Sequence, residues 1–181
     1  MTTAGLTQNY FEIFDLPTSY DIDLTELSTR YRKLQTAVHP DKFANASDLE
    51  RRISMQQSAL INEAYQTLKS PLLRARYMLQ LKGVDLTNES SVNMDSEFLM
   101  QQMRLREALE QVRDAQDPEA KLLVIAKEIE QAITEQITVL SRLFNEDNAD
   151  QLAKIADYVR RMQFMVKLQQ ETGALEEELL L

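Results

Sequence analysis

The sequence contains a single histidine, and it stands in the tripeptide His39-Pro40-Asp41. An imidazole and a carboxylate so close together could act as a general acid and base, or they could be read by a binding partner. Pro40 has no N–H to donate, and its ring disfavours helical dihedral angles at the preceding residue. We therefore expect His39 and Asp41 to face solvent where a helix ends, in a position suited to recognition.

Two other interpretations of the tripeptide remain open. An enzyme would need a nucleophile and an orienting group beside His39, and the chain has no cysteine and no second histidine from which to build such a set. Alternatively, His39 only caps the helix, because a cation at a helix C-terminus is favoured by about 0.3–1 kcal/mol. We favour recognition, because Pro40 and Asp41 add a rigid, charged presentation that capping does not need.

The composition excludes several classes of protein. The 181 residues suffice for one or two small domains. The lack of cysteine excludes disulfides and thiolate metal sites, and one histidine argues against a transition-metal site, so we expect no cofactor. The sequence shows neither a run of about 18 apolar residues nor a signal or transit peptide, so we expect a cytoplasmic protein without a membrane partner.

Charge is distributed unevenly along the chain. The net charge is −9, and residues 1–82 hold 10 basic and 9 acidic side chains, whereas residues 83–181 hold 10 and 20. A negative field repels phosphate backbones, so we expect no nucleic-acid partner. The change near Gly83 indicates a domain boundary, and we predict domains at residues 1–83 and 95–181 joined by a linker at residues 84–94.

The first domain is predicted to be a helical hairpin with a short helix on either side. Asp23 with Glu26 and Ser47 with Glu50 have the capping-box spacing, which predicts helices from about residue 23 to 38 and from 47 to 69. Short helices are expected at residues 10–14 and 71–81. The expected buried positions are Leu24, Leu27, Tyr31, Leu34, Val38, Ile53, Ile61 or Leu60, Ala64, Tyr65 and Leu68. The basic residues Arg30, Arg32 and Lys33 lie off this stripe, either to dock onto an acidic patch or as a solvated face.

The second domain is predicted to be an antiparallel three-helix bundle, with helices from about residue 95 to 115, 118 to 144 and 148 to 180. On the first helix the stripe Phe98, Leu105, Leu109 and Val112 should face the core. Leu99, Met100 and Met103 lie outside that stripe, as do Phe164 and Leu168 relative to the stripe Leu152, Ile155, Val159, Met162 and Val166. These second apolar surfaces either bind another protein, for which methionines are well suited, or pack on another part of the chain.

The order of these elements resembles a J-domain, the module with which DnaJ-class co-chaperones stimulate ATP hydrolysis by DnaK-class chaperones. The resemblance rests on a short aromatic helix, a basic helix with Tyr31-Arg32-Lys33-Leu34, the tripeptide His39-Pro40-Asp41, and a long third helix. It implies that the chaperone is bound by His39, Pro40, Asp41, Lys42, Arg30, Tyr31, Arg32 and Lys33.

The second domain is similar to that of the HscB family, the J-proteins of iron–sulfur cluster assembly. The similar segments are Asp95-Ser-Glu-Phe-Leu-Met-Gln-Gln-Met-Arg-Leu-Arg-Glu107 and Arg160-Arg-Met-Gln-Phe164. The resemblance implies a non-enzymatic co-chaperone that brings the scaffold protein IscU to the chaperone HscA and stimulates the ATPase of HscA. The implied scaffold-binding residues are Leu99, Met100, Met103, Arg104, Glu107, Gln111 and Phe164.

Two of these positions differ from the family pattern, because Arg104 and Gln111 stand where relatives carry acidic residues. The alternatives are a J-protein with another client and a helical adaptor that does not stimulate an ATPase.

Overall fold

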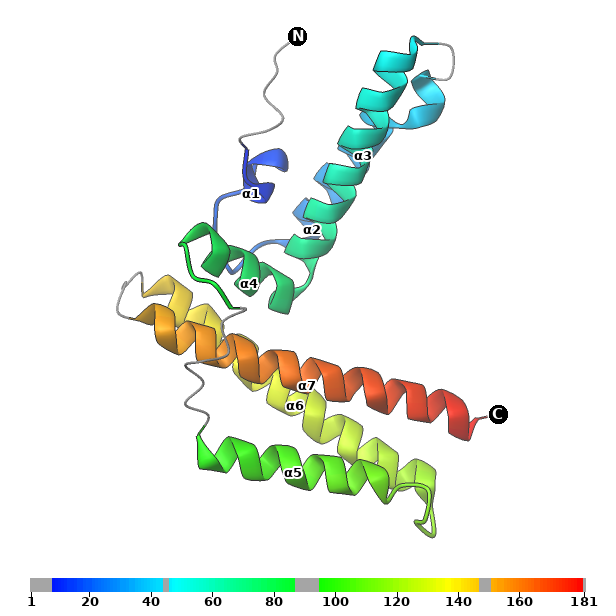
Figure 1. Cartoon of the computed structure of the whole chain (residues 1–181), viewed down its shortest axis with the longest axis vertical. Coiled ribbons are helices and arrows are strands. Elements are labelled where there is room, and N and C mark those ends of the chain that lie inside the picture. The colour runs from blue at the N-terminus through cyan, green and yellow to red at the C-terminus, as the bar shows by residue number, and fades with distance from the viewer. Residues whose placement is uncertain (1–7, 44–45, 87–94, 147–150, 181) are drawn as a thin grey trace. The chain divides into compact units, whose positions relative to one another are not determined.

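The structure is a computed structural model, and it describes residues 8–43, 46–86, 95–146 and 151–180. Within these ranges the chain forms α-helices, one short 3-10 helix and no strand, which confirms the all-α prediction (Figure 1). Packing divides the chain into two units, Met1–Leu81 and Lys82–Leu181. Most of the predicted linker, residues 87–94, lies outside the described residues. No helix in the described ranges is long and apolar enough to cross a membrane.

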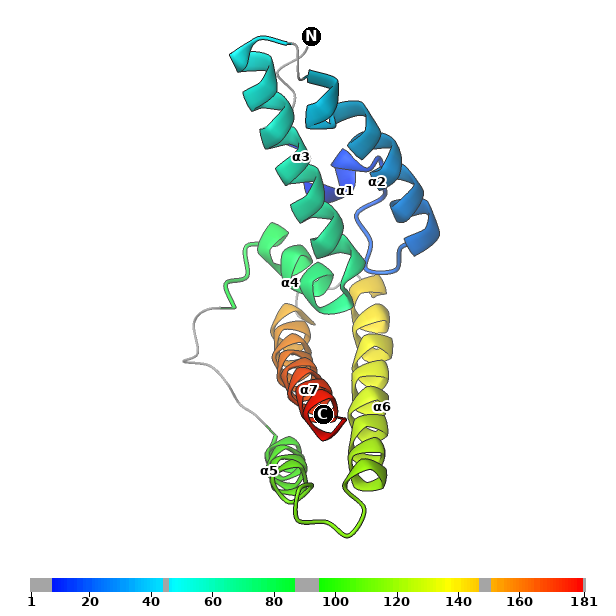
Figure 2. The same cartoon turned by 90° about the vertical axis from the view of Figure 1, so that its right-hand side faces the viewer.

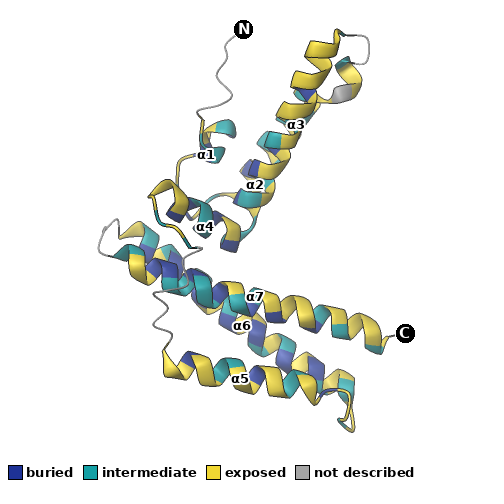
Figure 3. Ribbon diagram, viewed as in Figure 1, coloured by how far each residue is buried: buried dark blue, intermediate teal, exposed yellow. Residues whose placement is uncertain are grey.

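The first unit is built on a hairpin of two helices. Its elements are α1 (Tyr10–Ile13), α2 (Leu24–Val38), η1 (Pro40–Phe43), α3 (Asp48–Lys69) and α4 (Pro71–Leu81). The short helices α1 and α4 pack near the base of the hairpin, opposite to the tip where η1 lies (Figures 1 and 2). The core gathers at this base and includes Phe11, Phe14, Leu16, Tyr20, Leu27, Ile61, Ala64, Leu68, Leu72, Ala75, Met78 and Leu79. The tip therefore projects beyond the main core (Figure 3).

Two residues that the apolar stripe predicted to be buried are exposed, namely Leu24 and Ile53. Leu24 is the first residue of α2, and Ile53 lies on the part of α3 near the tip. Helical periodicity predicts which face of a helix is apolar, but it does not say how far along the helix the covering elements extend. Here α1 and α4 cover only the base of the hairpin, which leaves Ile53 near the tip exposed, whereas Leu24 is exposed at the first position of α2.

The helix starts follow local capping chemistry. The Ser47 hydroxyl accepts from the Glu50 N–H, and the Glu50 carboxylate accepts from the Ser47 N–H at 2.9 Å, which is the predicted capping box. Asp23 also caps its helix, accepting from the N–H groups of Thr25 and Glu26 at 2.7 and 3.1 Å. The predicted box at Asp23 is wrong in its other half, because the Glu26 carboxylate binds Arg30 instead.

The capping box should make the first unit sensitive to acid. Hydrogen bonds from the Ser47 hydroxyl and N–H lower the pKa of the Glu50 carboxyl. Because the folded-state pKa lies below the unfolded one, this stabilisation is present above the unfolded pKa and is lost as the pH falls through the folded pKa. We expect Glu50→Gln to lower the free energy of unfolding at about pH 7, and the difference from wild type to shrink by about pH 3. Urea unfolding at both pH values measures this, and a difference independent of pH would contradict it.

The second unit is a bundle of α5 (Ser96–Glu110), α6 (Pro118–Asn145) and α7 (Leu152–Leu179), with neighbouring helices antiparallel (Figure 1). A core cluster of this bundle comprises Phe98, Leu105, Val112, Leu122, Ile125, Ile129, Ala132, Met165 and Leu168. Helix α5 ends at Glu110, earlier than predicted, and the chain turns so that Val112 is fully buried. The predicted start of the last helix at residue 148 lies outside the described residues.

Candidate functional site

The turn at the tip of the hairpin is fixed by contacts from both of its sides. Helix α2 ends at Val38, and the Val38 carbonyl accepts a hydrogen bond of 2.7 Å from the hydroxyl of Ser54 on α3. The backbone then forms η1, in which the Lys42 N–H donates to the His39 carbonyl at 3.0 Å. Ser54 is buried and ties the end of one helix to the other. No local sequence pattern indicates this contact, because its two partners lie sixteen positions apart.

The side chains of His39 and Asp41 are both exposed, and they are held relative to each other. The His39 Nδ1 atom accepts from the Asp41 backbone N–H at 3.3 Å and lies 3.6 Å from the Asp41 carboxylate. The turn therefore holds an imidazole and a carboxylate side by side where a partner can reach both.

Ser54→Ala should loosen this turn. The substitution removes the hydroxyl donor and leaves the Val38 carbonyl without that partner, which costs about 1 to 2 kcal/mol. We expect a matching loss of unfolding free energy in urea and faster amide hydrogen exchange at Lys42. Ser58→Ala is the matched control, because Ser58 lies one turn further along α3. Equal behaviour of the two variants would contradict the role of Ser54.

Arg30 belongs to the packing of the first unit. Its guanidinium donates to the backbone carbonyls of Phe14, at 2.7 Å, and Asp15, and it binds the Glu26 carboxylate at 2.6 Å. These bonds tie the end of α1 to α2, and Asp15 has a positive φ of 52° at that point. Arg30 therefore positions elements of the hairpin and is already engaged with carbonyl and carboxylate oxygens.

Tyr31 also holds the hairpin together. Its ring stacks on that of Tyr65 with centroids 4.0 Å apart, and its hydroxyl donates to the Asn62 side chain at 2.8 Å. The remaining basic candidates for chaperone binding, Arg32, Lys33 and Lys42, are exposed. The structure thus divides these candidates into Arg30 and Tyr31, which support the hairpin, and three basic residues that remain exposed.

The exposed side of α5 carries two rows of residues. One row is Leu99, Met103 and Arg106, and the other is Met100, Arg104, Glu107 and Gln111. The first row borders α7, because the Arg106 guanidinium lies 5.5 Å from the centre of the Phe164 ring. The second borders α6, because Arg104 binds Glu128. Met100 and Met103 are 65% and 64% exposed, so α5 offers an apolar surface that the described part of its unit leaves uncovered.

The apolar residues predicted on the second surface of α7 behave differently from those on α5. Leu168 is fully buried in the core cluster, so the packing alternative is correct there. Phe164 is half-buried and its ring meets that of Phe98 edge-on, with centroids 6.1 Å apart. Only part of Phe164 is therefore available to a partner, and it lies beside the Leu99 row rather than the row of Met100.

The charges on the α6 side of α5 are partly paired. The hydrogen bond and attraction from Glu128 raise the pKa of the Arg104 guanidinium. Glu107 and Gln111 are exposed. A cation thus stands at position 104 with its charge already balanced within the unit.

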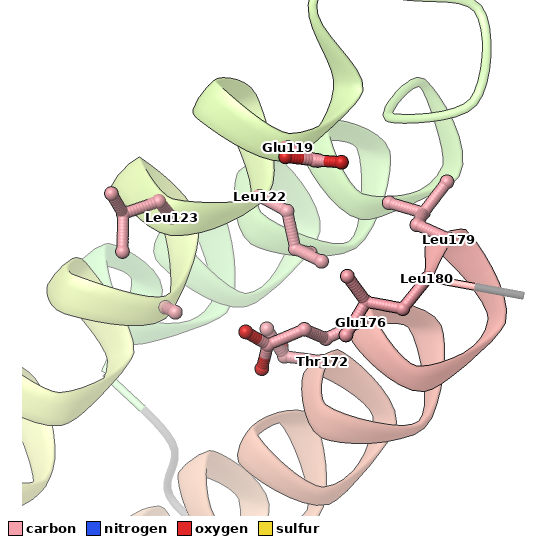
Figure 4. Close-up of a pocket in the computed structure, with 8 residues that line it drawn as sticks. Glu119, Leu122, Leu123, Thr172, Glu176, Leu179 and Leu180 are labelled. Atoms are coloured by element: carbon pink, nitrogen blue, oxygen red, sulfur yellow. The ribbon is translucent and has the colours of Figure 1, made fainter.

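A groove of about 300 Å³ lies between the start of α6 and the end of α7 (Figure 4). Leucine side chains line it, and Glu119 and Glu176 are its two carboxylates. The hydroxyl of Thr172, which also lines the groove, donates to the Leu168 carbonyl at 2.7 Å. Among the described residues, no group of three or more His, Cys, Asp or Glu could hold a metal ion.

Two family models match different parts of the chain. The family model of the DnaJ domain matches residues 9–77, and that of the HSCB C-terminal oligomerisation domain matches residues 94–173. A Co-chaperone protein HscB homolog of Shewanella pealeana is 47% identical over 175 residues, covering 95% of this chain and 99% of that protein.

Two solved structures of HscB proteins are also similar to this chain. Chaperone HscB from Vibrio cholerae is 40% identical, with a TM-score of 0.83 over 95% of this chain and 99% of that chain. The human co-chaperone protein HscB is 28% identical, with a TM-score of 0.87 over 97% and 86%.

Proposed function

The chain belongs to the HscB family of J-domain co-chaperones, and from that premise we propose that it delivers the scaffold protein IscU to the DnaK-class chaperone HscA in the cytoplasm. The delivery stimulates the ATPase of HscA during iron–sulfur cluster assembly and transfer. We assign chaperone binding to residues 1–83 and scaffold binding to residues 95–181. The chain itself catalyses no reaction.

The proposal that the first unit binds HscA rests on the fixed, exposed turn of His39 and Asp41. These side chains, with Pro40 and Lys42, would engage HscA, while Arg32 and Lys33 on α2 attract an acidic surface. Arg30 and Tyr31 support this face from within the hairpin. Binding can promote hydrolysis only if the J-domain prefers the hydrolysis-competent conformation of HscA, because a ligand shifts an equilibrium by its difference in affinity for the two states.

The proposal that the second unit binds IscU rests on the uncovered apolar side of α5. Leu99, Met100 and Met103 supply flexible apolar contacts, and Phe164 adds the accessible part of its ring. Arg104, Glu107 and Gln111 would form the polar border of the surface on the α6 side. An exposed apolar patch with a polar rim is typical of a protein-binding site.

Steady-state ATP hydrolysis by HscA from the same organism tests the proposal, with this chain and IscU added singly and together. We expect the two together to stimulate more than the sum of their separate effects. Stimulation that does not depend on IscU would retain the J-domain activity and point to a different client. A lack of any stimulation would reject the proposal and leave a helical adaptor.

A further inference from the structure

Arg106 occupies the edge of the α5 surface that faces α7. It follows Met103 by three positions and Leu99 by seven, so the three side chains share one face of the helix. The Arg106 side chain is exposed, and its guanidinium lies over the Phe164 ring at 5.5 Å. An arginine over an aromatic face is attracted to it, so the ring holds this cation in place.

Arg106 differs from the other arginines of its unit in lacking an acidic partner. Within residues 95–146 and 151–180, five of the six arginines have a carboxylate oxygen within 4.0 Å. These five are Arg104, Arg113, Arg142, Arg160 and Arg161. Arg106 has none among the described residues, although its half of the chain carries 20 acidic side chains against 10 basic ones. The charge of Arg106 therefore remains available to a partner.

The two edges of the α5 surface thus differ in charge. At the α6 edge the cation of Arg104 is balanced by Glu128. At the α7 edge the cation of Arg106 is fixed by a ring and lies next to Leu99 and Met103. A guanidinium with free N–H groups binds a carboxylate through two parallel hydrogen bonds, a geometry that lysine cannot reproduce.

We propose that Arg106 is the charged anchor of the scaffold-binding surface, and that the scaffold protein places a carboxylate there beside an apolar patch. The inference rests on the proposed function and specifies the chemistry of the partner at that site. It also sets the orientation of docking, because the acidic group of the partner must lie at the α7 edge of α5. The apolar contact then covers Leu99 and Met103.

Calorimetric titration of the full chain with IscU from the same organism tests the anchor. Arg106→Gln and Arg106→Met both remove the charge, and methionine still covers the Phe164 ring. We expect both to weaken binding by about 5- to 10-fold, and Arg106→Glu by about 30-fold or more. The affinity of both neutral variants should also depend less on salt concentration than that of the wild type. Lys127→Gln, the same change of net charge at an exposed position of α6, should bind as the wild type does.

The outcomes separate the anchor from the proposed function. If Arg106 only covers the Phe164 ring, Arg106→Met will bind IscU like the wild type, and the inference is overturned. If the Arg106 variants bind normally while Leu99→Ala with Met103→Ala binds poorly, the anchor is rejected and the scaffold-binding surface stands. If none of these variants affects IscU binding, both the proposed scaffold-binding surface and its anchor are rejected.

Discussion

His39→Gln should reduce the stimulation of the HscA ATPase by about 10-fold or more, because the coupling between two bound sites is typically of this size. The imidazole is held by the Asp41 N–H at 3.3 Å, so the ring has a fixed position beside the Asp41 carboxylate. Glutamine has a longer, more flexible side chain and cannot keep this arrangement. Since the His39 side chain is exposed, the fold should be unchanged. Initial rates of ATP hydrolysis with and without IscU measure the effect.

Two further variants sharpen this test. Asp41→Asn removes the carboxylate charge but keeps the backbone N–H that holds the His39 ring. A similar loss of ATPase stimulation would show that HscA recognises the charge itself. Gln66→Ala, an exposed position near the opposite end of α3, should stimulate normally. If His39→Gln stimulates the HscA ATPase fully and its circular dichroism is unchanged, the tripeptide serves only to end α2.

The parts of the fold that depend on neighbouring residues were predictable from the sequence. Ser47 and Glu50 lie three positions apart, and this local spacing was enough to place the start of α3. The same spacing failed at Asp23 because a third group, Arg30, competes for the Glu26 carboxylate. Arg30 itself was predicted to lie on an outer basic face, and only tertiary structure brings the Phe14 carbonyl to it.

The candidate surface on α5 was predictable only in part, because its exposure depends on tertiary packing. Helical angles separate Met103 from the core stripe, but they do not indicate what covers a second apolar surface. On α5 such a surface is uncovered, whereas Leu168 on α7 is buried in the bundle. The spacing of Arg106 from Met103 was visible in the sequence, but the ring of Phe164 beneath it was not.

Leu99→Ala combined with Met103→Ala should weaken IscU binding by about 10- to 100-fold, since truncating apolar anchors at the centre of an interface costs this much. Both side chains are exposed, so their loss leaves no cavity and should not lower the melting temperature. Titration calorimetry with IscU measures the affinity. Stimulation of HscA by this variant in the absence of IscU should equal that of the wild type.

The choice of positions follows from the packing of the bundle. The Phe164 ring meets Phe98 at 6.1 Å, so Phe164→Ala would lower stability together with binding. Pairing it with Met100→Ala would also mix the two edges of α5. Leu123→Ala with Val124→Ala is the matched control, because these residues of α6 are 56% and 66% exposed and lose comparable apolar groups. Equal affinity of the two double variants for IscU would show that α5 is not the surface that holds the scaffold.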